Sequence, residues 1–164
     1  MVRPVIQEPH PTLRKTAQKV SDFDDPKLVE LLEDMKDTLI QQEGLGLAAP
    51  QIDVSLAVFV IPPEMAPEVR IWYMPWTFWK PLRPTVFFNP RILSYTKEKE
   101  TEDEGCLSIR GFFTETARAA KVTLEAQNEK GQKLHIAASG LLARLFQHET
   151  DHLNGMLFID RLHK

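Results

Sequence analysis

The chain has 164 residues and a net charge of −3, from 20 Lys and Arg against 23 Asp and Glu. Its length and its 43% hydrophobic residues predict one packed domain spanning 1–164. The charge argues against a dedicated nucleic-acid binder, which needs an excess of positive charge, and the single cysteine, Cys106, excludes an internal disulfide and favours a reducing compartment.

No targeting or membrane segment is evident. Acidic residues and prolines interrupt the first 30 residues, so the apolar core of a signal peptide is missing. No run approaches the about 20 apolar residues that span a bilayer. We therefore expect a soluble, cytoplasmic protein with no membrane partner.

Residues 26–43 predict an N-terminal amphipathic helix. Pro26 suits its first turn and Gly44 suits its end. Apolar side chains recur at helical spacing, at Leu28, Leu31, Leu32, Met35 and Leu39. This stripe is expected to pack in the core.

The middle of the chain predicts strands on either side of an unusual segment. Residues 55–61 are β-branched and aromatic and predict a buried strand. Residues 62–84 contain six prolines and all three tryptophans, and prolines at that density break helices and central strands. Residues 85–89 then predict a strand that Pro90 ends.

The C-terminal third predicts a hairpin and a final helix. Residues 121–127 and 132–138 flank an Asn-Glu-Lys-Gly turn, which is typical of a β-hairpin. Residues 139–155 predict a helix with Ser139 as its N-cap and Asn154–Gly155 at its end. The order of helix, strands and helix favours an α+β fold, with antiparallel sheet packed on two helices.

The last predicted helix contains an H-E-x-x-H pattern formed by His148, Glu149 and His152. Residues i and i+4 lie one turn apart, so the two imidazoles can converge on one metal ion, with Glu149 beside them to transfer protons. Leu141 and Leu145 continue the same face toward the core, which predicts buried histidines that need partners. The alternative is a surface helix with two solvated histidines.

A tetrahedral metal site with one water needs a third protein ligand. The residues after His152 offer no histidine or glutamate at the spacing of the longer zinc peptidase motifs. Cys106 is the remaining candidate. An acidic, glycine-containing turn precedes it, and this context favours a ligand role. The alternative is a small buried apolar cysteine.

Three blocks together resemble the motifs of peptide deformylases, in the family order. They are GLGLAAPQ at 44–51, EGCLS at 104–108 and QHETDH at 147–152. The resemblance extends from the region of Leu13 to Leu162 and is weakest at residues 62–84. It implies an α+β fold in which antiparallel β-sheets pack around a central metal-binding helix.

The resemblance implies hydrolysis of the N-formyl group from the initiator formyl-methionine of nascent polypeptides, with release of formate. It implies one divalent ion, ferrous iron in cells with zinc, nickel or cobalt as alternatives, held by Cys106, His148 and His152. Glu149 would transfer the proton. The side chain of Gln51 and the backbone N–H of Leu107 would stabilise negative charge on the formyl oxygen.

The resemblance also implies a site for the N-formylmethionyl peptide. Gly44 and Gly46 leave room for a peptide backbone, and an extended substrate would pair with the strand edge at Leu45. Leu45, Leu141 and Leu145 are candidates for the methionine pocket. Their periodicity also fits ordinary core residues.

Further positions extend the match or depart from it. Glu104 and Arg118 stand where the family often forms an ion pair; two solvated charges are the alternative. Arg110 replaces a proline found in many members, and Phe113 cannot supply the charge of an arginine that some members use to reach the substrate. The chain ends at Lys164, so we expect no C-terminal helix for ribosome docking.

Other classes remain open. One is a metallo-amidase that acts on another small N-acyl substrate. A second is an inactive, metal-stabilised binding module, which Glu149 and Gln51 argue against because a structural metal needs neither. A zinc peptidase is the third.

The segment 62–84 has its own alternatives. Its aromatic residues need cover or form an exposed apolar patch. Three hypotheses are open. The aromatic residues pack back on the domain as a cluster, they form a rim that binds the peptide downstream of methionine, or they form a self-association surface. The residues concerned are Trp72, Tyr73, Trp76, Phe78 and Trp79.

Overall fold

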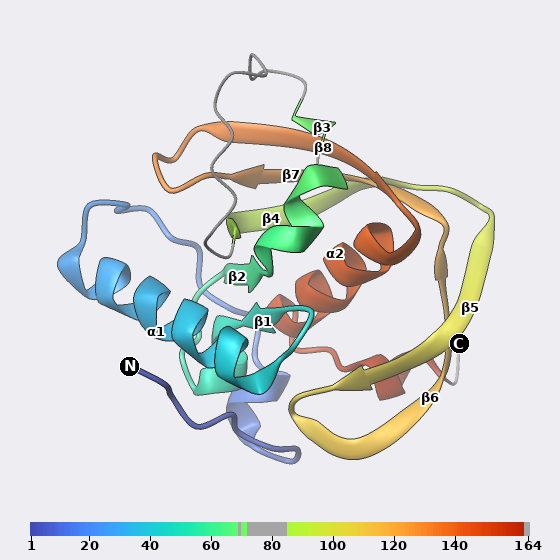
Figure 1. The fold of residues 1–164 in the computed structure, drawn as a ribbon, viewed down its shortest axis with the longest axis horizontal. Helices are drawn as coiled ribbons and strands as arrows, with labels where there is room; N and C mark the ends of the chain where they lie inside the picture. The colour runs from blue at the N-terminus through green and yellow to red at the C-terminus, as the bar shows by residue number, and fades with distance from the viewer. Residues whose placement is uncertain (69, 72–84, 163–164) are drawn as a thin grey trace.

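The computed structural model of the chain describes residues 1–68, 70–71 and 85–162 (Figure 1). In these residues the α-helices are α1 (Pro26–Gln42) and α2 (Gly140–Leu153). The strands are β1 (Leu47–Ala48), β2 (Val58–Ile61), β3 (Arg70–Ile71), β4 (Thr85–Tyr95), β5 (Lys99–Cys106), β6 (Ile109–Ala119), β7 (Lys121–Gln127) and β8 (Lys133–Ser139).

All strand pairs between these elements are antiparallel. Six strands form one sheet in the order β1-β2-β4-β7-β8-β3, and β5 and β6 form a separate two-stranded ribbon. The expected α+β fold with antiparallel sheets and two helices is confirmed. The predicted hairpin is formed by β7 and β8.

Helix α1 covers one face of the six-stranded sheet (Figure 1). Its apolar side chains share a core with residues of β2 and β4, namely Val58, Val60, Val86 and Phe88. The helix begins at Pro26, as expected, and ends at Gln42. Glu43 rather than Gly44 takes the left-handed conformation that follows, with a φ of 51°.

Helix α2 lies between the opposite face of the sheet and the β5–β6 ribbon, which curves around it (Figure 1). Phe146 of α2 packs on Phe59 and Phe87, with ring centroids 6.1 and 5.3 Å away. These two residues alternate along their strands with those that face α1. Ser139 is the N-cap residue, but its side chain makes no capping hydrogen bond.

Strand β4 does not end at Pro90, contrary to the sequence-based expectation. It continues to Tyr95, and its register against β7 shifts between Phe88 and Arg91. Asn89 has a φ of 48° at this irregularity. Pro90 therefore lies in a bulge, where a residue without an N–H leaves no ladder hydrogen bond unmade.

Strand β2 is shorter than the predicted 55–61. The aromatic residues Trp72, Tyr73, Trp76, Phe78 and Trp79 lie outside the described residues, so the hypotheses about them remain predictions. Among the described residues, no helix is both long and apolar enough to cross a membrane.

Candidate active site

Three potential metal ligands converge between the ribbon and α2. Cys106 Sγ, from the end of β5, lies 3.2 Å from His152 Nε2, which lies 3.1 Å from His148 Nε2 on the same helix. All three ligand atoms lie within 4.8 Å of one another. A thiolate and two imidazoles suit zinc or iron, and one ion with bonds of about 2.0–2.3 Å reaches all three atoms. The donor set therefore fits a divalent metal.

The ring of His148 is held from two sides. Its Nδ1 lies 2.6 Å from the carboxylate of Glu104, and its Nε2 lies 3.1 Å from Nε2 of His152. A carboxylate in this position fixes the tautomer and orientation of a ligand histidine. The ring also stacks on Phe158, with centroids 6.3 Å apart. His152 is 1% exposed, and its Nδ1 has no hydrogen-bond partner among the described residues.

Glu104 belongs to a buried ionic network. Arg118 forms a two-pronged ion pair with it, at 2.8 and 2.5 Å, and Arg144 donates to the same carboxylate at 2.8 Å. Arg118 also bonds Asp151 of α2 at 2.8 Å. Burial raises the pKa of Glu104, but the hydrogen bonds from Arg118 and His148 outweigh burial and hold the pKa well below its ordinary value. The expected pair of Glu104 and Arg118 is present and is buried rather than solvated.

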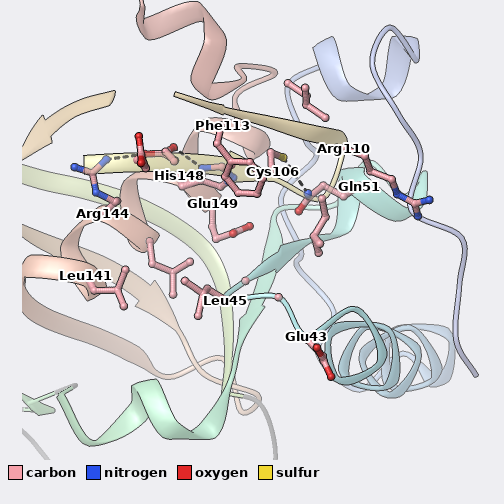
Figure 2. A pocket seen from close by; sticks show the side chains of 18 of the residues that line it. Glu43, Leu45, Gln51, Cys106, Arg110, Phe113, Leu141, Arg144, His148 and Glu149 are labelled. Atoms are coloured by element: carbon pink, nitrogen blue, oxygen red, sulfur yellow. Dashed lines mark hydrogen bonds and ion pairs between the residues drawn. The ribbon is translucent and has the colours of Figure 1, made fainter. Parts of the chain in front are cut away.

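Glu149 lies near Cys106 and His148 and is buried (Figure 2). Its Oε2 has no hydrogen-bond partner among the described residues. Burial raises the pKa of this carboxyl group to about 7. A carboxylate with such a pKa can accept a proton and return it near neutral pH.

The side chain of Gln51 has a defined direction. Ala48 donates its N–H to Oε1 at 2.8 Å, so the amide nitrogen faces the other way. There Nε2 approaches Cys106 Sγ at 3.5 Å and Ser108 Oγ at 3.3 Å (Figure 2). Leu107 lines the same pocket. The two expected donors to a formyl oxygen thus lie next to the ligand cluster.

A pocket of about 450 Å³ opens beside these groups. It is lined by every residue expected to contact the substrate, namely Gly44, Leu45, Gly46, Leu141 and Leu145. Leu45 and Leu141 are 51% and 49% exposed, whereas Leu145 is 6% exposed. The expected strand edge at Leu45 is displaced, because β1 begins only at Leu47. Strand β1 lies at the edge of the described sheet, where it pairs with β2 alone.

Phe113 shapes the mouth of the pocket. A Cβ built on Gly105 would lie 2.6 Å from Cδ1 of Phe113, so the ring covers the backbone next to Cys106. The ring is itself 70% exposed. The exposed Phe113 ring therefore gives an apolar surface at the position near which the resemblance implied an arginine in some family members.

Sequence reasoning missed several supporting residues. Asp151 accepts hydrogen bonds from Arg118 and Arg161, and the fully buried Ser108 accepts one from Gln51. Asp151 and Ser108 both lie inside the matched motifs, and this position was the sequence feature from which a supporting role could have been predicted. Phe158 carries no such signal, because only the tertiary fold brings it to His148.

Comparison with known proteins gives a consistent result. A family profile described as polypeptide deformylase matches residues 2–164. A peptide deformylase of Rhizobium meliloti (strain 1021) is 36% identical over 99% of this chain and 86% of its own length. One of Natranaerobius thermophilus is 41% identical over 92% and 86%. The crystal structure of the Thermotoga maritima peptide deformylase is similar with a TM-score of 0.82, at 35% identity over 98% of this chain and 97% of that one.

Proposed function

The chain belongs to the polypeptide deformylase family, and from this membership we propose how its own residues perform the reaction. It is a hydrolase that removes the N-formyl group from the initiator formyl-methionine of nascent polypeptides. Water adds to the formyl carbon, the carbon–nitrogen bond breaks, and formate and a free amine are released. The convergence of Cys106, His148 and His152 is the observation that supports the assignment of roles below.

The proposed metal site uses these three ligands. We assign one divalent ion, ferrous iron in cells, with zinc, nickel or cobalt accepted by the same donors. Such an ion supplies the positive charge that ionises a water molecule near neutral pH and polarises the formyl group. In this proposal α2 is the metal-binding helix and α1 the N-terminal amphipathic helix of one catalytic domain over residues 1–164, working in the cytoplasm.

Glu149 is assigned the proton transfer. Its buried carboxylate accepts the proton that the attacking water loses and returns it to the departing amine. The pKa of about 7 suits both halves of this task, since neither protonation state is strongly favoured at neutral pH. The absence of a competing hydrogen bond to Oε2 among the described residues leaves that atom available.

Gln51 and Leu107 are assigned to the formyl oxygen. Negative charge develops on that oxygen as water adds to the carbon, so fixed N–H donors nearby lower the barrier. The hydrogen bond from Ala48 turns the amide nitrogen of Gln51 toward this position, so no rotation is needed during the reaction. The backbone N–H of Leu107 supplies the second donor.

The peptide is assigned to the edge formed by Gly44, Leu45 and Gly46. This segment leads directly into β1, which has a strand on one side only in the described sheet, so an extended chain is placed alongside it by strand addition. The methionine side chain enters the apolar part of the pocket at Leu45, Leu141 and Leu145. The exposed ring of Phe113 offers contact area to the following residues of the nascent chain.

Formate release tests the function directly. The chain is purified without oxygen, its bound metal is measured, and it is incubated with a formyl-Met peptide or an acetyl-Met peptide. We expect formate from the first and little acetate from the second, because the proposed substrate carries a formyl group. Hydrolysis of both at equal rates would favour a metallo-amidase of broader specificity. A metal-loaded chain without activity would favour a binding module.

A further inference from the structure

Residues 6–8 connect the two backbone segments that carry the proposed oxygen-binding donors. Ile6 donates its N–H to the carbonyl of Gln51 at 2.9 Å. Glu8 donates its N–H to the carbonyl of Ser108 at 3.0 Å. Gln7, between them, directs its side chain to the turn that follows β5. Three consecutive residues thus hold together segments that are more than 50 positions apart in sequence.

The side-chain amide of Gln7 bridges a backbone group of that turn and one at the start of β6. Its Nε2 donates to the carbonyl of Leu107 at 2.9 Å, and its Oε1 accepts the N–H of Arg110 at 3.4 Å. Gln7 does not line the substrate pocket. Its side chain also donates to the carbonyls of Val5 and Ile6, at 3.2 and 3.5 Å, so its contacts lie within the protein and outside the pocket.

The carbonyl of Leu107 shares a peptide group with the N–H of Ser108. That N–H donates to Cys106 Sγ at 3.4 Å. Because a trans peptide is planar, its C=O and N–H point to opposite sides. A hydrogen bond that fixes the carbonyl toward Gln7 therefore also fixes the N–H toward the sulfur.

We propose that Gln7 is a positioning residue, which orients the Leu107–Ser108 peptide so that its N–H donates to the thiolate of Cys106. The inference rests on the proposed function, since it takes Cys106 as a metal ligand. A hydrogen bond to a ligand sulfur withdraws electron density from it and so tunes the metal. The same contact holds Leu107 in place beside Gln51.

Two variants separate the contacts of Gln7. Gln7→Met keeps the length of the side chain and loses its hydrogen bonds to Leu107 and Arg110, together with the local ones to the carbonyls of Val5 and Ile6. Gln7→Glu keeps an acceptor for the N–H of Arg110 and loses the donor to Leu107. Gln18→Met is the matched control, because Gln18 is exposed in the same N-terminal region and its side chain bonds no described residue.

The experiment uses the full chain loaded with cobalt(II) and records the thiolate-to-cobalt charge-transfer band. We expect the band to move to lower energy in both Gln7 variants, because the sulfur becomes more electron-rich, and to stay in place in Gln18→Met. With formyl-Met peptide, kcat should fall about 10-fold with KM unchanged. This is the lower end of the range of losses seen when a residue that contacts a metal ligand is replaced.

Each other outcome has a distinct meaning. A band that stays in place in Gln7→Met contradicts the inference, even if the melting temperature falls, because Gln7 would then be only structural. A wild-type band in Gln7→Glu also contradicts it, since the contact with Arg110 would suffice. A band that is missing from the wild type, or that persists in Cys106→Ser, would instead overturn the ligand assignment of the proposed function.

Discussion

Gly46 lies directly against the carboxylate of Glu149. A Cβ built on Gly46 would come 2.8 Å from Cδ of Glu149, closer than carbon atoms approach without displacement. The edge proposed to bind the peptide and the group proposed to transfer the proton are therefore in contact. In the proposed binding mode, a formyl-methionine paired with this edge lies next to that carboxylate.

Gly46→Ala should lower kcat/KM by at least about 10²-fold, because the methyl group displaces the Glu149 carboxylate, to which we assign the proton transfer. Gly44→Ala is the graded control: its Cβ would lie 2.9 Å from the end of the flexible Leu107 side chain, which can move aside. We expect the smaller loss there. Equal losses in steady-state assays of the two variants would contradict the role of this contact.

Cys106→Ser should weaken the binding of ferrous iron or change the metal selected, because a hydroxyl group is a poorer ligand than a thiolate. The measurement is metal content after anaerobic loading with iron. In air, the iron form of the wild type should lose activity faster than the nickel form, since nickel(II) resists the oxidation that ferrous iron undergoes. Equal half-lives would count against an iron site with a thiolate ligand.

Glu104→Gln should reduce metal affinity about 10- to 100-fold, because the neutral amide no longer holds Nδ1 of His148 as a carboxylate does. Glu102→Gln, at an exposed position of the same strand, serves as the control. Metal dissociation constants from competition with a chelator provide the measurement. Unchanged affinity in Glu104→Gln would show that His148 orients itself without this partner.

Arg118→Met should lower the free energy of unfolding by about 3–5 kcal/mol, because it leaves the buried carboxylates of Glu104 and Asp151 without their shared cation. Arg91→Met removes an ion pair in which Arg91 is 69% exposed, and should cost less than about 1 kcal/mol. Urea unfolding of both variants gives the comparison. A similar cost for the two would mean that burial adds nothing to the network.

The sequence predicted the elements in which a local signal repeats. Periodic apolar residues marked both helices, and the hairpin turn marked β7 and β8. The i, i+4 spacing of His148 and His152 predicted that their imidazoles would meet, because helix geometry alone determines that distance. Cys106 could be weighed as the third ligand only by elimination and family resemblance, since no periodicity relates a strand end to a distant helix.

What escaped prediction depends on contacts between distant residues. Strand β5 is almost entirely polar and charged, so no alternation of apolar residues predicts a strand there. It is held in place by its pairing with β6 and by the ion pairs of Glu104 to α2. The bulge at Asn89 lets β4 continue through Pro90. Gln7 reaches Leu107 across 100 positions of sequence, and an isolated glutamine carries no local sign of such a contact.

The most direct test of the account is Glu149→Gln, measured for bound metal and for formate release from a formyl-Met peptide in the same preparation. The amide keeps the shape of the side chain but cannot accept the proton of the attacking water. We predict wild-type metal content with a loss of turnover of at least about 10²-fold. A metal-loaded Glu149→Gln enzyme with near wild-type turnover would contradict the assignment of proton transfer to this residue.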